Sequence, residues 1–237
     1  MKLFLLALAS LVAPFAAGYG ATAESKPVAR VIAVLDIETD DPGAYATWIK
    51  HYNEAAKAKL NIDPYLRVYQ SGFDGRTTGR VRTVSSAASV AELMKNSQLL
   101  ENDPAILENQ THLRAIRQIG ARVLYQALRF DGPSPKGANN YNTLAVIPDE
   151  AAYLAAIVEL REIFDAVGLK DAKIGVYRVL AGRTDHTHRI TISTPSRDHL
   201  GAFLDLAASN PQLVAWLAST AKLRTVVANS TSREITK

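Results

Sequence analysis

The sequence predicts an α+β fold made of two successive units, each with the order strand, helix, strand, strand, helix, strand. The first observation is an internal repeat. Val68-Tyr69 recurs 108 residues later as Val176-Tyr177, and the following blocks recur in the same order, with 81–84 matched to 190–193. The second observation is helical spacing of apolar residues in the same part of each unit. A repeat of this length indicates two duplicated domains rather than a solenoid.

The first unit is expected over residues 28–130. Its β-branched opening stretch, 28–37, predicts a strand, and the residues from Asp40 to Gly43 are typical of a helix start. The inner stripe of that helix recurs at Tyr45, Trp48, Ile49, Tyr52 and Ala56. Further strands are expected at 65–70, 80–84 and 121–129, with helices at 89–100 and from Pro104 onward.

The second unit is expected over residues 141–230, after a linker at 131–140 that is rich in Pro and Gly. The helical stripe of the first unit returns at Tyr153, Ala156, Ile157, Leu160 and Phe164. Strands are expected at 141–147, 174–179, 187–193 and 223–228, and helices around Leu200 and Pro211. The strand and helix order of the first unit is therefore predicted again.

Composition excludes several classes of protein. The 237 residues are 48% hydrophobic and 21% charged, which is enough apolar material for a buried core. Because 27 basic residues face 23 acidic ones and the excess is evenly spread, we expect no nucleic-acid partner. The absence of cysteine excludes disulfides and lipid attachment to a thiol.

Residues 1–23 have the pattern of a secretory signal peptide. Lys2 precedes an apolar stretch from Leu3 to Phe15, and small residues follow up to Ala23. At about 1.5 Å per residue this stretch is too short for a bilayer core of about 30 Å, so we expect no stable membrane anchor. The mature protein is therefore expected to be periplasmic or secreted.

The unit order is that of the ferredoxin-like βαββαβ fold. Two such units in one chain, with Asp103-Pro104 and Asn210-Pro211 opening their last helices, resemble the dimeric α+β barrel superfamily. The resemblance covers nearly all of the mature chain and implies a pseudo-dimeric barrel in which two sheets meet face to face. It also implies that one chain completes the barrel, so we expect a monomer.

That superfamily includes cofactor-independent monooxygenases acting on aromatic polyketides and quinols, haem-handling enzymes and lactone isomerases. The resemblance implies a small-molecule ligand, aromatic or quinone-like, and leaves two functions open. One is cofactor-independent oxygenation, for which we expect no cofactor; the other is non-catalytic ligand binding or interaction in the periplasm. An enzyme should have a cavity of about 300 Å³ or more with convergent polar groups, whereas a binding or structural protein should have a filled core and an exposed apolar patch.

His51 is the candidate catalytic residue. It lies between Trp48 and Tyr52 on the first long helix, at the edge of the buried stripe. A neutral imidazole there can act as a base, and histidines of some relatives of this fold ligate haem from the helix side. The alternative is a boundary histidine bonded to a carbonyl or to water.

The segment from Asp185 to His188 is a second histidine pattern. On a strand, His186 and His188 would point the same way, as two imidazoles on one metal require, with Asp185 or His199 as a third ligand. The alternative is a polar hairpin tip. Because the first unit holds no histidine at the matched positions, we expect no metal site.

Aromatic residues form the candidate ligand pocket. Rings offer a large contact area with a polar handle, so a flat apolar ligand is expected to be lined by Trp48, Tyr52, Tyr69, Tyr125 and Trp216. The alternative is that these rings are core packing.

Arginines are expected on the face of each sheet away from the helices. If Val81 and Thr83 face the helices, then Arg80 and Arg82 face the other way, because strand side chains alternate, and Arg189 follows them.

Arg67 and Tyr69 should share that face, because Val68 between them is expected to pack on the helices. Guanidinium groups buried between two sheets need carboxylates, for which Asp36 and Glu38 are the nearest candidates, or a bound anion. We therefore expect Arg67, Arg80 and Arg82 to line a polar cleft, held by ion pairs or open to an acidic small molecule.

Overall fold

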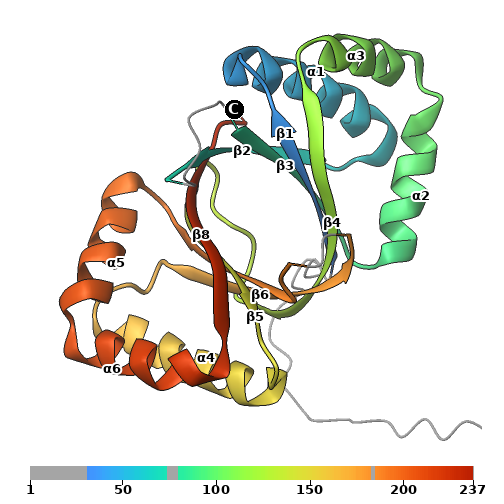
Figure 1. The fold of residues 1–237 in the computed structure, drawn as a ribbon. Coiled ribbons are helices and arrows are strands. Elements are labelled where there is room, and N and C mark those ends of the chain that lie inside the picture. The colour runs from blue at the N-terminus through green and yellow to red at the C-terminus, as the bar shows by residue number, and fades with distance from the viewer. Residues whose placement is uncertain (1–30, 74–79, 183–184, 237) are drawn as a thin grey trace, which may run out of the picture.

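The computed structural model describes residues 31–73, 80–182 and 185–236. In this part of the chain the fold is α+β, with eight antiparallel strands closed into one barrel and six α-helices around it. Figure 1 looks along the barrel and shows the helices of the N-terminal half packed on one side and those of the C-terminal half on the opposite side. None of the described helices is long and apolar enough to cross a membrane. The expected signal peptide, 1–23, lies outside the described residues.

The strands are β1 (Val31–Glu38), β2 (Leu66–Gly72), β3 (Arg80–Ala87), β4 (Gln118–Phe130), β5 (Asn139–Val146), β6 (Lys173–Ala181), β7 (His188–Thr194) and β8 (Thr225–Glu234). The helices are α1 (Pro42–Leu60), α2 (Val90–Glu101), α3 (Pro104–Ala115), α4 (Glu150–Ala166), α5 (Arg197–Ser209) and α6 (Pro211–Thr220). The expected elements are present in the expected order. The last strand differs most: it was expected to end at 228, but it continues to 234.

The barrel is continuous. Its strand order is β1-β3-β2-β8-β5-β7-β6-β4, so each half of the chain contributes four adjacent strands. The halves are joined by antiparallel pairing of β2 with β8 and of β4 with β6. The expected barrel is confirmed, and its two halves do more than face each other: their outer strands hydrogen-bond to each other, which leaves the eight described strands without a free edge.

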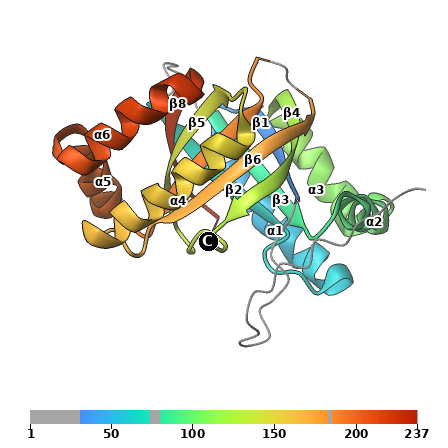
Figure 2. The ribbon, with the colours of Figure 1, turned by 90° about the horizontal axis from the view of Figure 1, so that it is seen from below.

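The alternating strand directions give the barrel two distinct ends. The β2–β3 and β6–β7 connections lie at one end, while the segment between β4 and β5 and the C-terminus lie at the other. Figure 2 shows the barrel from the side, with α1–α3 and α4–α6 on either flank.

The two halves share one pairing register. Arg82 on β3 lies opposite Tyr69 on β2, and Arg189 on β7 lies opposite Tyr177 on β6. Arg82 and Arg189, 107 residues apart, therefore occupy equivalent places, and the sequence match of 81–84 with 190–193 is two residues out of register. Because side chains alternate with a period of two, this displacement leaves the helix-facing positions on the correct side.

Every α-helix begins at a side chain that accepts a hydrogen bond from a first-turn backbone N–H, as an N-cap should. These residues are Asp41, Ser89 and Asp103 in the N-terminal half and Asp149, Ser196 and Asn210 in the C-terminal half. The equivalent caps show how the helices of one half correspond to those of the other.

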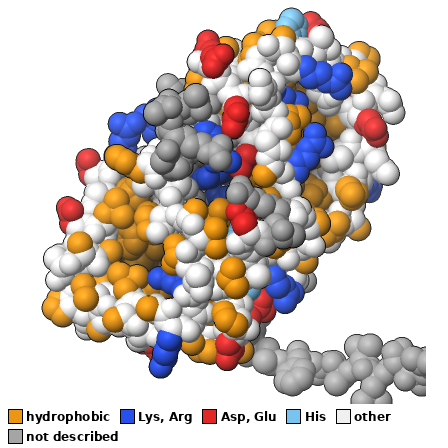
Figure 3. All heavy atoms as spheres, viewed as in Figure 1, with side chains coloured by type: hydrophobic (Ala, Val, Ile, Leu, Met, Phe, Trp, Pro, Cys, Tyr) orange, Lys and Arg blue, Asp and Glu red, His pale blue; other side chains and the backbone are white. Residues whose placement is uncertain are grey.

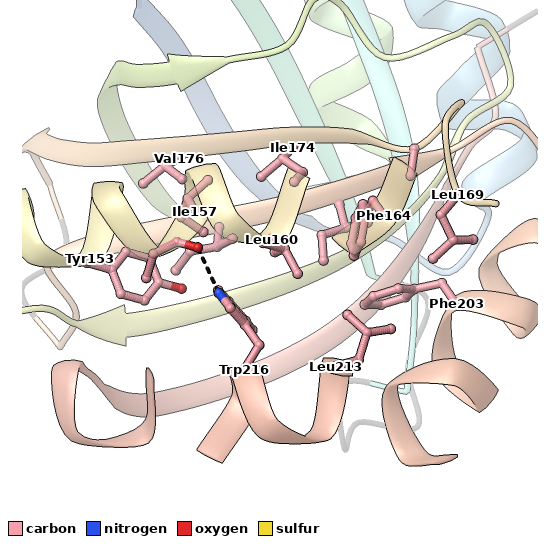
Figure 4. Close-up of a cluster of buried hydrophobic side chains, with 14 of the residues drawn as sticks. Tyr153, Ile157, Leu160, Phe164, Leu169, Ile174, Val176, Phe203, Leu213 and Trp216 are labelled. Atoms are coloured by element: carbon pink, nitrogen blue, oxygen red, sulfur yellow. Dashed lines mark hydrogen bonds between the residues drawn. The ribbon is translucent and has the colours of Figure 1, made fainter. Parts of the chain in front are cut away.

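The core is filled unequally in the two halves. Behind α4–α6, one large cluster contains Phe164, Phe203 and Trp216, and the Trp216 Nε1–H donates to the Ala156 carbonyl at 2.7 Å (Figure 4). Behind α1–α3, the buried apolar residues form separate smaller clusters. The space between helices and sheet is therefore less completely filled in the N-terminal half.

Candidate functional site

A cavity of about 550 Å³ lies between α1–α3 and the outer face of β1, β3 and β4. Its apolar wall includes Leu35, Ile49, Leu66, Leu113, Ile119 and Leu124. Its polar groups include Tyr52, Thr83, Ser85, Ser97, Gln110 and Arg117. A mainly apolar cavity of this size with a few polar groups is typical of small-molecule sites.

Smaller side chains on the helices account for this space. Counted from the equivalent N-caps, the positions of Phe164, Phe203 and Trp216 are held in the N-terminal half by Ala56, Asn96 and Asn109. The corresponding cavity of the C-terminal half, which Trp216 and Phe203 line, measures only about 240 Å³. Figure 3 shows hydrophobic side chains gathered around a hollow over α5, α6 and β8, where this smaller cavity lies.

Two arginines line the larger cavity: Arg122, which is exposed, and Arg117, just before β4, which is partly buried. The Arg117 Nη1 lies 3.4 Å from the Tyr45 hydroxyl, and its buried Nε has no hydrogen-bond partner in the described chain. The equivalent Arg224 is held more firmly: it donates to the Tyr153 hydroxyl at 2.7 Å and lies 5.6 Å from the centre of the Trp216 ring. Arg117, unlike Arg224, therefore has donor capacity left for a ligand.

The phenols of α1 complete the polar side of the cavity. The Tyr45 hydroxyl lies 2.7 Å from Thr83 Oγ1, which fixes the Thr83 side chain at the cavity wall. Burial raises the pKa of Tyr52 to about 12, although a hydrogen bond with Gln110 opposes the shift. The Tyr52 phenol is therefore neutral at physiological pH and can donate a hydrogen bond, whereas it is not a base.

His51, the expected catalytic residue, does not reach this cavity. Its half-exposed side chain lies on the outer side of α1, with Nδ1 3.5 Å from Glu54. The neighbouring Trp48 stacks on His112 at 3.9 Å between ring centroids. Neither histidine lines the cavity, whose described lining contains no His, Asp or Glu. The described lining therefore supplies neither an axial histidine for haem nor an acid or base that titrates near neutrality.

Arg80 and Arg82 lie inside the barrel, on the face that strand alternation predicts. Arg80 Nη2 is 2.7 Å from Asp36 Oδ2, and Arg82 Nε is 3.1 Å from Asp36 Oδ1. Arg82 Nη1 also donates to the Ser230 hydroxyl at 3.1 Å. Asp36 was the expected partner, and this ion pairing is confirmed; a role for these arginines in binding a ligand stays a prediction.

Arg67 lies at the opposite end of the barrel. It donates to the Ser134 carbonyl at 2.9 Å and lies 3.6 Å from Glu234 Oε2. Tyr69 is buried nearby inside the barrel, and burial raises its pKa. Arg67 and Arg82 line different cavities, so the described residues do not form the expected cleft shared by three arginines, and the cavity that Arg82 lines measures only about 30 Å³.

The two histidines before and at the start of β7 point to different partners. His186 Nδ1 lies 2.7 Å from Asp185 Oδ1, and its Nε2 lies 3.0 Å from the Tyr125 hydroxyl inside the barrel. His188 Nε2 instead lies 3.0 Å from Glu150. His186 precedes the strand, so the strand alternation that would align the imidazoles does not apply. Among residues 31–73, 80–182 and 185–236, no group of three His, Asp or Glu side chains is placed to hold a metal.

Of the predicted ligand-binding set, only Tyr52 therefore lines the larger cavity, and Arg117, Thr83 and Gln110 were missed. One signal could have found Arg117. It recurs as Arg224 at a distance of 107 residues, beside the repeated tyrosines Tyr45 and Tyr153.

No protein-family model matches the sequence, and neither does any curated protein. Among solved structures, a proposed monooxygenase from Fusobacterium nucleatum has a TM-score of 0.58 at 10% identity, with 87% of this chain and 92% of that chain covered. A proposed monooxygenase from Lactobacillus acidophilus has a TM-score of 0.55 at 8% identity, with 87% of this chain and 93% of that chain covered.

A haem-binding protein from Thermus thermophilus has a TM-score of 0.52 at 6% identity, covering 87% of this chain and 91% of its own. At such identities the likeness concerns the fold alone. The chain has the dimeric α+β barrel fold, and its own two halves close the barrel.

Proposed function

We propose that this protein binds a small, flat, largely apolar molecule bearing an acidic oxygen, of aromatic or quinone-like type, in the cavity behind α1–α3. The observation that carries the proposal is Arg117. Its guanidinium lines this cavity, its buried Nε has no partner, and it forms no salt bridge with a described residue. Arg117 is partly buried, and a partly desolvated charge without a counter-charge is costly, so an anionic oxygen of the ligand would stabilise it.

The cavity also indicates how such a ligand would lie. Leu35, Ile49 and Leu113 offer apolar surface to a ring system, while the Tyr52 phenol and the Gln110 amide offer polar contacts. The acidic oxygen would point toward Arg117, where a charge-assisted hydrogen bond is stronger than a neutral one.

Calorimetric titration with 2-hydroxy-1,4-naphthoquinone, which is flat and singly negative at neutral pH, tests this proposal. We expect Arg117→Met to weaken binding by about tenfold or more, because a hydrogen bond to a charged group is lost. Arg224→Met is the matched control, since Arg224 holds the equivalent place in the other half, and its affinity should equal that of the wild type. Absence of wild-type binding, or equal affinity of the Arg117→Met variant, would contradict the proposal.

A second candidate is oxygenation in the same cavity without a cofactor, which the two proposed monooxygenases of the same fold favour. In such a reaction a ring CH₂ becomes C=O with one atom of O₂, and the other oxygen atom leaves as water with both hydrogens. Because the described lining holds no base near neutrality, Arg117 would act by stabilising the substrate anion.

Oxygen uptake with an anthrone separates the two candidates. The enzyme hypothesis expects uptake by protein that native mass spectrometry and absorbance show to be free of cofactor, with one ¹⁸O atom from ¹⁸O₂ in the product. It also expects much slower uptake by Arg117→Met. Tight binding without uptake above the background rate would instead establish a non-catalytic ligand-binding protein.

We also propose that the chain is a tandem duplication, with domains over 28–130 and 141–230, and that it is exported. The shared register of Arg82 and Arg189 and the equivalent helix caps support the duplication. The pattern of residues 1–23 supports export to the periplasm or medium. Mass measurement of protein from the native cell envelope should show loss of the leader, whereas a full-length cytoplasmic chain would contradict export.

A further inference from the structure

Two arginines from the two halves face one small cavity inside the barrel. Arg82 on β3 and Arg189 on β7 hold equivalent places, each opposite a tyrosine of the neighbouring strand. Both are buried, and both line a cavity of about 30 Å³ within the barrel. Two like charges are thus brought to one site by the near symmetry of the fold.

Their counter-charges are unequal. Opposite Arg82 on β1 stands Asp36, whereas opposite Arg189, at the equivalent place on β5, stands Leu144. Asp36 is itself shared, because it also binds Arg80 at 2.7 Å. The second half of the barrel therefore repeats the arginine without repeating its carboxylate.

Arg189 has only neutral hydrogen-bond acceptors. It donates to Asn142 Oδ1 at 2.7 Å and to Thr191 Oγ1 at 3.3 Å, and it forms no salt bridge with any residue that the structure describes. Its positive charge also acts on Arg82, whose pKa is lowered by burial first and by Arg189 second. The interior thus carries an excess of positive charge, which is costly unless an anion compensates it.

We propose that a small monovalent inorganic anion, such as chloride, binds in this cavity between the guanidinium groups of Arg82 and Arg189. A cavity of about 30 Å³ holds one ion or water-sized particle and excludes a carboxylate or phosphate ligand. The Ser230 hydroxyl, which accepts from Arg82, keeps its own proton for the anion. This site is separate from the cavity behind α1–α3.

Bromide serves as the probe. At constant ionic strength, with gluconate replaced by bromide from 1 to 100 mM, we expect the wild-type Tm to rise by about 3 °C or more, because the anion binds only the folded state. Crystals grown in bromide should show an anomalous peak between the two guanidinium groups. A Tm independent of bromide, or an interior without such a peak, would overturn the proposal.

A matched pair of variants tests whether the anion binds because Arg189 has no carboxylate opposite it. Leu144→Asp supplies the negative charge that Asp36 supplies in the other half, so the bromide dependence of Tm should disappear. Leu144→Asn has a similar shape without the charge and should retain the dependence. If both variants respond to bromide equally, the proposal fails.

If the Leu144→Asp variant does not fold, the Arg189→Met variant provides a second test of the same site. Removing an uncompensated buried charge should leave the protein folded and its Tm insensitive to bromide. Arg178→Gln, which changes a more exposed arginine on β6, should respond to bromide like the wild type. A bromide response that persists in Arg189→Met would count against the assigned site.

Discussion

At the scale of single residues, Asp36 is the carboxylate that both Arg80 and Arg82 use inside the barrel. Its two oxygens contact different guanidinium groups, so its loss leaves two buried cations without their partner. Breaking a buried ion pair from one side is more costly than the pair's own net contribution, because the remaining charge stays desolvated.

We therefore expect Asp36→Asn to lower the free energy of unfolding by about 3 kcal/mol, measured by urea denaturation. Asp63→Asn is the control, because Asp63 pairs with Lys57 at 2.8 Å on the exposed surface. Such pairs contribute little, so this variant should unfold almost like the wild type. Equal effects of the two substitutions would show that the interior pair is not desolvated.

Glu234 gives the stability a dependence on pH. Burial raises its pKa above the ordinary value of 4.5, while Arg67 opposes the shift. Below 4.5 the carboxyl is protonated in both states. Between 4.5 and the higher folded-state pKa, the folded protein binds more protons than the unfolded chain, so its contribution to stability falls as pH rises.

The Glu234→Gln variant has an amide in place of this carboxyl, and the amide does not titrate. The free energy of unfolding of the wild type, minus that of the variant, should therefore fall as pH rises from about 4.5 and level off above the folded-state pKa. Urea denaturation of both proteins at several pH values measures this difference. A difference that grows with pH would mean that Arg67 and the backbone N–H of Gly137 outweigh burial.

At the scale of elements, the helix starts are determined locally. Asn210 caps α6 by accepting from the backbone N–H groups of Gln212 and Leu213, as Asp103 does for Ala105 and Ile106 at α3. Proline follows both caps, where its missing N–H costs nothing. Such a start depends on residues within one turn, which explains why the sequence alone located it.

We expect Asn210→Ala to lower the Tm through the loss of about 1 kcal/mol of stability. Asn210→Asp should retain the wild-type Tm or exceed it, because Asp accepts the same bonds and its charge is favourable at a helix N-terminus. Thermal denaturation followed by circular dichroism measures both variants. Equal losses in both would show that the cap does not stabilise α6.

The end of β8 shows the limit of local patterns. Ser230, Ser232 and Glu234 continue the strand into the barrel interior, where the Ser230 hydroxyl meets Arg82 and Glu234 meets Arg67. A strand whose buried face is polar has no apolar alternation. The sequence pattern therefore ended six residues before the strand does.

At the scale of the whole molecule, the pairing of β2 with β8 and of β4 with β6 uses the outer strands of both halves within one chain. A chain with a single four-strand sheet would need a second copy of itself to pair its outer strands. This chain pairs them within itself. We therefore expect light scattering at micromolar concentration to give the mass of one chain. An obligate dimer would contradict this expectation.

What the sequence by itself determined is the set of elements and the faces of the strands. Helical spacing located α1 and α4, and the period of two placed Arg80 and Arg82 away from the helices even though the repeat was matched two residues out of register. These properties depend on neighbours along the chain, so a local pattern is enough to predict them.

The tertiary structure decided where the cavity lies and which arginine faces it. His51 and Tyr52 are adjacent in sequence, yet only Tyr52 lines the cavity, because the two side chains project from different faces of α1. Arg117 meets Tyr45 across 72 residues, and Arg82 meets Ser230 across 148. Such contacts arise from closure of the barrel and from the space that smaller helix residues leave, and both depend on packing between segments far apart in the chain.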